Sequence, residues 1–235
     1  MDQGKRKKRR TSRCAGSPIN PAFGELRVWP YMDEKDVADV NAAADSFQRT
    51  RAPISRVDAP SRSGVYTIYL CPRNLLAPFA EGENGLIYIG LSARLSDREF
   101  SQHFSSNSTG FSTLRRSLGA VLKDQLSLRA IQRASGTSES NVRNYRFDAK
   151  GEEVLTKWMC EHLEVGIYVT DRYKELENLL VPHLKPLLNL TKWKNPYRLA
   201  IKGLRKVCAN EARQVRLQAR HSKPLQPIAG KTRSG

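Results

Sequence analysis

The chain has 235 residues and a formal net charge of +17 at pH 7. This length suits one ordinary domain with extensions, or two very small domains. The start of the chain is charged, and no apolar run approaches the roughly 18 residues that span a bilayer. We therefore expect neither a secretory signal nor a membrane-spanning helix.

The positive charge is concentrated at the two ends of the chain. Residues 1–13 hold seven Lys or Arg against one Asp, residues 191–235 hold twelve against one Glu, and residues 14–190 are neutral. A small domain needs a net charge of only about 2–8 for solubility. The pattern favours a folded core whose arms bind a polyanion, and it would also suit a ribosome-like or chromatin-like binder or an anionic membrane.

The four cysteines form no CxxC pair and have no histidine at zinc-finger spacing, so we expect no structural zinc site. Scattered cysteines fit a reducing compartment. The expected location is the cytoplasm or nucleoid, or the nucleus if the source is eukaryotic. The run Lys5–Arg10 suits a nuclear-import patch and a nucleic-acid-binding arm equally well.

The first half of the chain predicts a tail, a helix and a hairpin. Residues 1–32 are expected to be a basic, disordered tail, and Asp33 is a good N-cap for an amphipathic helix that ends near Arg49. Residues 51–63 are interpreted as a linker. Val65–Leu70 and Leu86–Ile89 are predicted strands, joined by a loop with Pro, Gly and Asn residues.

The second half predicts alternating helices and short strands. The expected helices cover Arg94–Phe104, Thr113–Lys123 with Ser112 as cap, Gly151–Leu163, Asp171–His183 with Asp171 as cap, and a basic helix over Pro196–Arg220. The expected strands are Tyr145–Phe147 and Val165–Thr170, and 133–144 is expected to be a surface loop. The predicted fold class is α+β, with a small three-stranded, mainly antiparallel sheet flanked by helices.

Five elements occur in a characteristic order. Gly64-Val65-Tyr66 and Tyr88-Ile89-Gly90 lie on the two hairpin strands, Arg98 lies on the next predicted helix, and Glu177 precedes Asn189 by twelve residues. Together they resemble the GIY-YIG nuclease family. The resemblance covers about 62–190, which leaves 1–32 as a tail, 33–61 as a short helix and linker, and 191–235 as a basic helix and tail.

The resemblance implies catalytic roles for both tyrosines, for Arg98 and for His103. Tyr66 would relay a proton of the attacking water or contact the scissile phosphate, although a strand tyrosine is also a common half-buried structural residue. Tyr88 would be its partner phenol, and Arg98 would stabilise the charge of the transition state. His103 follows Arg98 by five positions, where the family more often has four, and would act as base or hydrogen-bond donor.

The resemblance also implies a metal site and an orienting amide. Glu177 would bind Mg²⁺ (or Mn²⁺), together with water and substrate oxygens. The alternative is a purely structural role, in which Glu177 lies on the helix surface and pairs with Lys174 or Lys185. Asn189 would hold backbone or substrate by hydrogen bonds. The two tyrosines are 22 residues apart, about twice the spacing usual in the family, so the loop between their strands is longer.

Further basic residues are candidates for contacts with DNA phosphates. Arg94 is one helical turn before Arg98, and Arg115 and Arg116 follow a serine-rich loop, where a solvated helix face is equally possible. The full set of expected DNA-binding residues is Arg94, Arg115, Arg116, Lys194, Arg198, Lys202, Arg205 and Lys206. Such contacts give salt-dependent affinity that is largely independent of sequence.

The sequence therefore predicts a metal-dependent endonuclease that hydrolyses phosphodiester bonds in DNA, with RNA not excluded, no membrane partner and a restriction-like role preferred. A homodimer is expected if the protein cuts both strands. The alternative is a non-catalytic nucleic-acid-binding protein, either an inactive nuclease fold or a basic protein associated with RNA or the ribosome.

Overall fold

The structure is a computed structural model, and it describes residues 32–96, 103–104 and 108–221. Arg98, most of the helix predicted over Arg94–Phe104, and nearly all of the basic tail lie outside the described residues. Within the described part, no helix is long and apolar enough to cross a membrane.

An antiparallel sheet forms the centre of the fold, and the predicted α+β class is confirmed. In the described residues the strand order is β1 (Ala52–Pro53), β6 (Leu163–Val169), β2 (Gly64–Leu70) and β3 (Leu86–Ser92). Every neighbouring pair is antiparallel. The prediction of three strands was one short, because β1 lies in the supposed linker and pairs at the edge, where a proline is tolerated.

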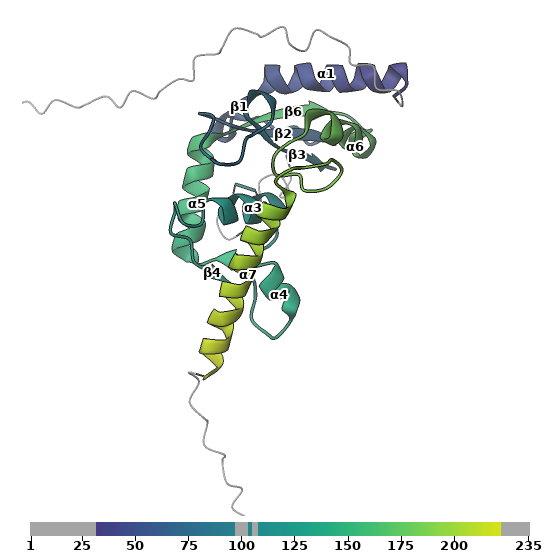
Figure 1. Cartoon of the computed structure of the whole chain (residues 1–235). Coiled ribbons are helices and arrows are strands. Elements are labelled where there is room, and N and C mark those ends of the chain that lie inside the picture. The colour runs from purple at the N-terminus through teal and green to yellow at the C-terminus, as the bar shows by residue number, and fades with distance from the viewer. Residues whose placement is uncertain (1–31, 97–102, 105–107, 222–235) are drawn as a thin grey trace, which may run out of the picture.

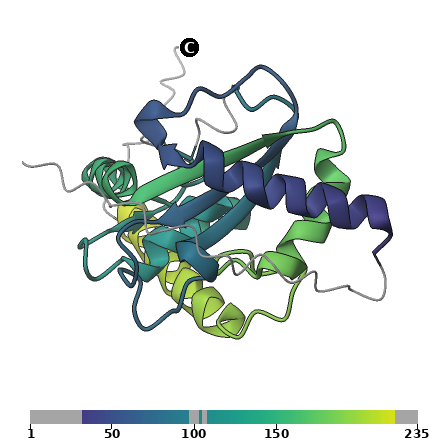
Figure 2. The ribbon, with the colours of Figure 1, turned by 90° about the horizontal axis from the view of Figure 1, so that it is seen from above.

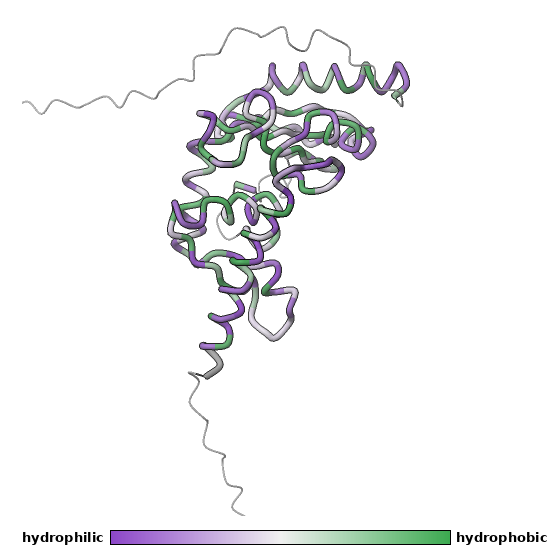
Figure 3. The backbone as a smooth tube through the Cα atoms, in the orientation of Figure 1, coloured by the Kyte–Doolittle hydropathy of each residue, from purple (hydrophilic) through white to green (hydrophobic). Residues whose placement is uncertain are grey.

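Two helices cover one face of this sheet. α1 (Glu34–Thr50) lies across it, and α6 (Tyr173–Leu184) lies beside β3 (Figures 1 and 2). Hydrophobic and hydrophilic residues alternate along α1 (Figure 3), and its buried side includes Val40 and Phe47. As predicted, Asp33 caps the helix by accepting a hydrogen bond from the backbone of Asp36.

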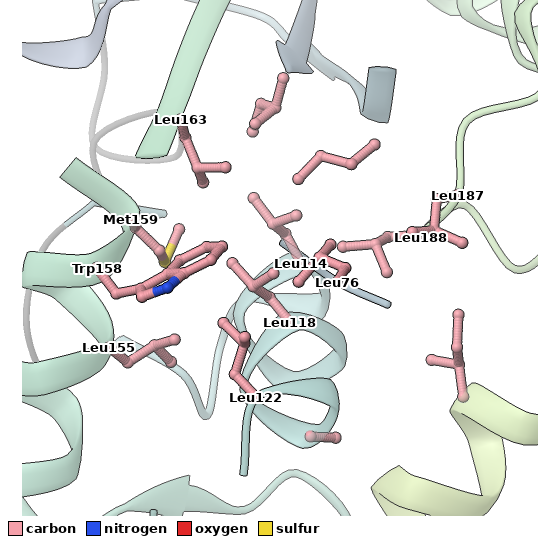
Figure 4. Close-up of a cluster of buried hydrophobic side chains, with 14 of the residues drawn as sticks. Leu76, Leu114, Leu118, Leu122, Leu155, Trp158, Met159, Leu163, Leu187 and Leu188 are labelled. Carbon is pink, nitrogen blue, oxygen red and sulfur yellow. The ribbon is translucent and has the colours of Figure 1, made fainter. Parts of the chain in front are cut away.

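The other face packs against a second layer of elements, which gather at the opposite end of the molecule from α1 (Figure 1). They are α3 (Thr113–Val121), β4 (Ala130–Ile131), α4 (Glu139–Arg143), β5 (Arg146–Phe147), α5 (Ala149–His162) and α7 (Arg198–His221). Leucines of α3, Trp158 and Met159 of α5, and Leu187 and Leu188 converge in its core (Figure 4). Because strand side chains alternate, Tyr66 and Ile68 face this layer, whereas Val65 faces α1.

Two local predictions were wrong. α6 begins at Tyr173 with Arg172 at the N-cap, whereas Asp171 accepts a hydrogen bond from the hydroxyl of Ser63. The segment predicted as a surface loop contains the short helix α4. Its glutamate Glu139 forms ion pairs with Arg213 and Arg216 of α7, so tertiary contacts support a helix that has little apolar content of its own.

Candidate active site

The two tyrosines lie on one face of the β2–β3 hairpin. Tyr66 is opposite Gly90, and Tyr88 is opposite Ile68, so the phenols are diagonal neighbours with ring centroids 6.3 Å apart. A Cβ atom at Gly90 would overlap the ring of Tyr66. The glycine of the Tyr-Ile-Gly motif thus allows the first tyrosine to lie flat across the second strand.

His103 joins this pair. Its Nε2 lies 2.6 Å from the hydroxyl of Tyr66, and its Nδ1 lies 2.7 Å from Oγ of Ser112. The imidazole is also in edge contact with Tyr88, at 5.9 Å between ring centroids. The arrangement is a continuous polar chain from Tyr66 through His103 to Ser112, which is the N-cap of α3.

The surroundings keep His103 neutral and Tyr88 protonated. Burial, reinforced by the charge of Arg115, lowers the pKa of His103 to about 4. Burial and, to a smaller extent, the charge of Glu177 raise the pKa of Tyr88 to about 12, although the charge of Arg116 opposes them. At neutral pH, His103 is therefore an uncharged imidazole with one unprotonated ring nitrogen, whereas Tyr88 keeps its proton and is a hydrogen-bond donor.

A fully buried ion pair holds the backbone of His103 in place. Arg115 of α3 and Glu152 of α5 approach to 2.8 Å with no side-chain exposure. Arg115 also donates to the carbonyl of His103, and Thr109 donates to Glu152. The expectation that Arg115 contacts DNA is wrong, because its guanidinium is committed to the interior.

Arg116 is also not the surface residue that we expected. It is only 7% exposed, and its terminal nitrogens donate to the carbonyls of Thr109 and Gly110 and to the hydroxyl of Thr113. Its charge is close enough to Tyr88 to affect the pKa of the phenol. Arg116 therefore holds the turn at Thr109–Gly110 and contributes positive potential at Tyr88.

Glu177 lies on α6 and is 7% exposed. Its carboxylate forms an ion pair with Lys192, and its charge reaches Tyr88. The described residues contain no group of three metal-binding side chains. A single carboxylate whose charge reaches Tyr88 nevertheless fits Mg²⁺ or Mn²⁺, since these ions take most of their ligands from water and substrate oxygens.

Asn189 binds backbone rather than facing a substrate. Its side-chain Oδ1 accepts a hydrogen bond from the backbone N–H of Ile89 at 2.9 Å, and its side-chain Nδ2 donates to the backbone carbonyl of Ile89 at 2.8 Å. Leu188 adds a hydrogen bond to the carbonyl of Ile87. The segment after α6 thus closes the free edge of β3 at the Tyr88-Ile89-Gly90 motif.

The other basic residues that were expected to bind DNA differ in how far they are exposed to solvent. Arg94, Lys194, Arg198, Lys202 and Lys206 are exposed, and Arg205 is half-buried. The charge of Arg205 acts on Arg116, which places it on the side of α7 that faces α3. These positions are compatible with a basic surface, and their contacts with DNA remain predictions.

Three residues of the site were not singled out for chemistry from the sequence. Ser112 was predicted only as a helix cap, and no sequence pattern pointed to a functional role for Glu152 or Lys192. A cap is recognisable from its position before a helix, but its second contact depends on a residue nine positions earlier in the chain. Glu152 and Lys192 acquire their partners only through tertiary packing.

Comparison with known proteins identifies the family. The model of the GIY-YIG catalytic domain matches residues 64–207, which is more than half of the chain and includes the first part of α7. No curated protein and no solved structure matches the chain significantly. Its two motifs, their shared face on the hairpin and the family match together show that this chain belongs to the GIY-YIG family, a family of nucleases.

Proposed function

We propose that this protein is a metal-dependent endonuclease that hydrolyses phosphodiester bonds in DNA. The observation that carries the proposal is the hydrogen-bonded chain from Tyr66 through His103 to Ser112, with Tyr88 in contact with the imidazole. A phenol coupled to a neutral imidazole is a proton-transfer device, and general acid–base catalysis of this kind contributes about 10²–10⁴-fold to a rate.

The proton moves along this chain during hydrolysis. As a water molecule attacks the phosphorus in line, Tyr66 takes its proton and passes the phenolic proton to Nε2 of His103. The bond between phosphorus and the leaving 3′ oxygen breaks, and that oxygen takes a proton from solvent. Tyr88, which keeps its own proton, donates a hydrogen bond to a phosphoryl oxygen. Arg98, by its family resemblance, neutralises charge on the phosphate.

Glu177 is the residue that would hold the metal ion. A Mg²⁺ or Mn²⁺ ion bound there would polarise the phosphate and stabilise the leaving oxygen. Lys192 forms an ion pair with the same carboxylate, so its ammonium group and a metal ion would compete for Glu177. The basic face of α7 and the basic ends would hold the DNA through its phosphates.

A plasmid-nicking assay tests this function. Wild-type protein with Mg²⁺ is expected to nick supercoiled DNA. Addition of EDTA, or the substitution Glu177→Ala or Tyr66→Phe, should lower the rate of nicking by at least about 100-fold. Binding of DNA by each variant, measured by fluorescence anisotropy in EDTA, serves as the control. Wild-type protein that binds DNA but never cuts it contradicts the proposal.

The contact between Lys192 and Glu177 favours one second candidate, a DNA-binding protein that has lost the reaction. In that case the lysine permanently replaces the metal. Lys192→Ala discriminates the two, because nicking that appears only in this variant identifies the lysine as an inhibitor.

Cleavage of both strands would require two centres, since one centre cuts one strand at a time. We propose a homodimer for concerted double-strand cleavage. Sedimentation under the conditions of the assay tests it: a monomer that makes concerted double-strand breaks contradicts the dimer.

A further inference from the structure

Phe111 is exposed although it lies directly before Ser112, which with Tyr66, Tyr88 and His103 forms the proposed catalytic cluster. It is 68% exposed, whereas the next residue, Ser112, is buried and contacts His103. Phe111 is also the one aromatic residue among the large exposed hydrophobic residues that the structure describes. Single exposed apolar residues are common, so the exposure gains meaning only from what surrounds the ring.

The turn that carries Phe111 is held firmly. The backbone amides of Phe111 and Ser112 both donate to the carbonyl of Ser108, at 2.9 and 3.1 Å. Arg116 donates to the carbonyl of Gly110 at 2.8 Å. On its other side, Gly110 is so close to the methylene groups of Arg133 that a Cβ atom there would overlap them. The ring is therefore presented to solvent by a fixed backbone.

A guanidinium group accompanies the ring. Cζ of Arg133 lies 5.1 Å from the centroid of Phe111, which is a cation–π distance. The backbone amide of Arg133 donates to the carbonyl of Asn141, and its side chain donates to the amide oxygen of the same residue. The cation is thus oriented beside the ring by its contacts with Asn141 of α4.

Positive charge around this turn is not balanced by carboxylates. None of the ion pairs in the described residues involves Arg116, Arg133 or Arg205. Burial, reinforced by the charges of Arg205 and Arg133, lowers the pKa of Arg116 to about 10. An aromatic ring and uncompensated guanidinium groups are the two components by which proteins bind single-stranded nucleic acid.

We propose that Phe111 and Arg133 form a nucleobase-binding platform beside the catalytic cluster. An unpaired base next to the scissile phosphate stacks on the ring of Phe111, and Arg133 and Arg205 bind the flanking phosphates. The inference rests on the proposed nuclease function and names its substrate class, which is DNA with unpaired bases, such as a flap, a gap or a branch, in preference to uninterrupted duplex.

The test compares binding of two substrates by the full chain in EDTA. One is a flapped oligonucleotide and the other is its fully paired counterpart, both measured by anisotropy at one fixed salt concentration. Phe111→Ala is expected to weaken binding of the flapped substrate about ten-fold and to leave duplex binding within about two-fold, because stacking needs a free base. Phe111→Trp should retain the preference.

Matched variants separate stacking from charge and from folding. Leu199→Ala removes another exposed apolar side chain, 82% exposed on α7, and should change neither affinity. Arg133→Met keeps the apolar stem, and should reduce the slope of log affinity against log salt by about one. Thermal unfolding of each variant is the control for folding: Phe111 and Leu199 are largely exposed, and Arg133→Met keeps the apolar stem beside Gly110, so each variant should stay folded at the temperature of the assay.

The outcomes are distinct from those of the nicking assay. Equal binding of the flapped substrate by wild type and Phe111→Ala overturns the platform, even if the protein cuts DNA. A change in oligomeric state with unchanged nucleic-acid binding also overturns it and assigns the ring to a protein contact. If Phe111→Ala binds the flapped substrate more weakly than wild type does, but wild type never cuts DNA, the result supports the platform and rejects the nuclease function.

Discussion

Ser112 serves two structural purposes at once, and they can be separated. Its Oγ accepts a hydrogen bond from the amide of Arg115 as the N-cap of α3, and it also contacts Nδ1 of His103. A cap is worth about 1 kcal/mol of stability. Its contact with the imidazole instead affects which nitrogen carries the proton.

Ser112→Asp is expected to keep the cap and to place a carboxylate at Nδ1 of His103. The negative charge favours the imidazolium, so the pKa of His103 should rise from about 4. The acidic limb of the pH–rate profile should then move to higher pH in single-turnover nicking between pH 4 and 8. Ser112→Asn, a neutral cap, is the control, and identical profiles for all three proteins would contradict a role of Ser112 in the proton chain.

Gly90 is required by the ring of Tyr66 and not by backbone conformation. Gly90→Ala should lower the free energy of unfolding by about 1–3 kcal/mol, the cost of overpacking, and should displace the tyrosine from the cluster. Urea denaturation and nicking measure the two effects. Gly203 on α7 has open space around it, so Gly203→Ala should instead stabilise the protein, by about 0.5–1 kcal/mol; equal effects of both changes would reject the argument.

Among the elements, α3 and α5 act as a support for His103. Their buried pair, Arg115 and Glu152, also binds the carbonyl of His103 and the backbone amide of Phe147. Because each member of the pair is fully desolvated, the loss of one partner leaves a buried charge uncompensated. The support is therefore vulnerable to a single substitution in either helix.

Arg115→Met should lower the free energy of unfolding by about 3–5 kcal/mol and reduce nicking even under conditions where the protein remains folded. Urea denaturation with tryptophan fluorescence measures the stability. Glu139→Gln, which breaks the exposed ion pairs with Arg213 and Arg216, should have a much smaller effect. If both substitutions cost the same, the buried pair has no special importance for the fold.

For the molecule as a whole, His103 makes stability depend on pH. Among the described residues, the charged or titratable groups in contact with it are Tyr66 on β2, Tyr88 on β3 and Arg115 on α3. Its pKa is about 4 in the folded chain and about 6.5 in an unfolded one. Between these values the unfolded chain takes up a proton that the folded chain refuses, so stability falls as pH drops through this window.

The expected loss between pH 6.5 and pH 4 is on the order of 3 kcal/mol, with no further contribution from His103 below that range. Thermal or urea unfolding at several pH values measures it. His103→Gln keeps a polar side chain that does not titrate, and the corresponding part of the pH dependence should disappear. A variant with the same pH profile as wild type would show that the histidine does not titrate in this way.

Local patterns in the sequence were sufficient to predict the hairpin, most of the helices and the family. Alternation along β2 and β3 predicts that Tyr66 and Tyr88 share a face, and Asp33 and Ser112 are recognisable caps because their partners lie three residues away. Such features depend on neighbours within one turn or one strand, and these are written directly in the sequence.

Only the tertiary structure decided which polar residues are interior. Arg115 and Arg116 have the same local pattern as solvated helix arginines, and Arg115 is buried because Glu152, 37 residues later, lies beside it. The exposure of Phe111, the contact of Ser112 with His103 and the pairing of Lys192 with Glu177 likewise depend on how separate segments pack together. Burial and charge pairing are properties of the packed chain, so they follow from which elements meet and not from the order of residues within any one of them.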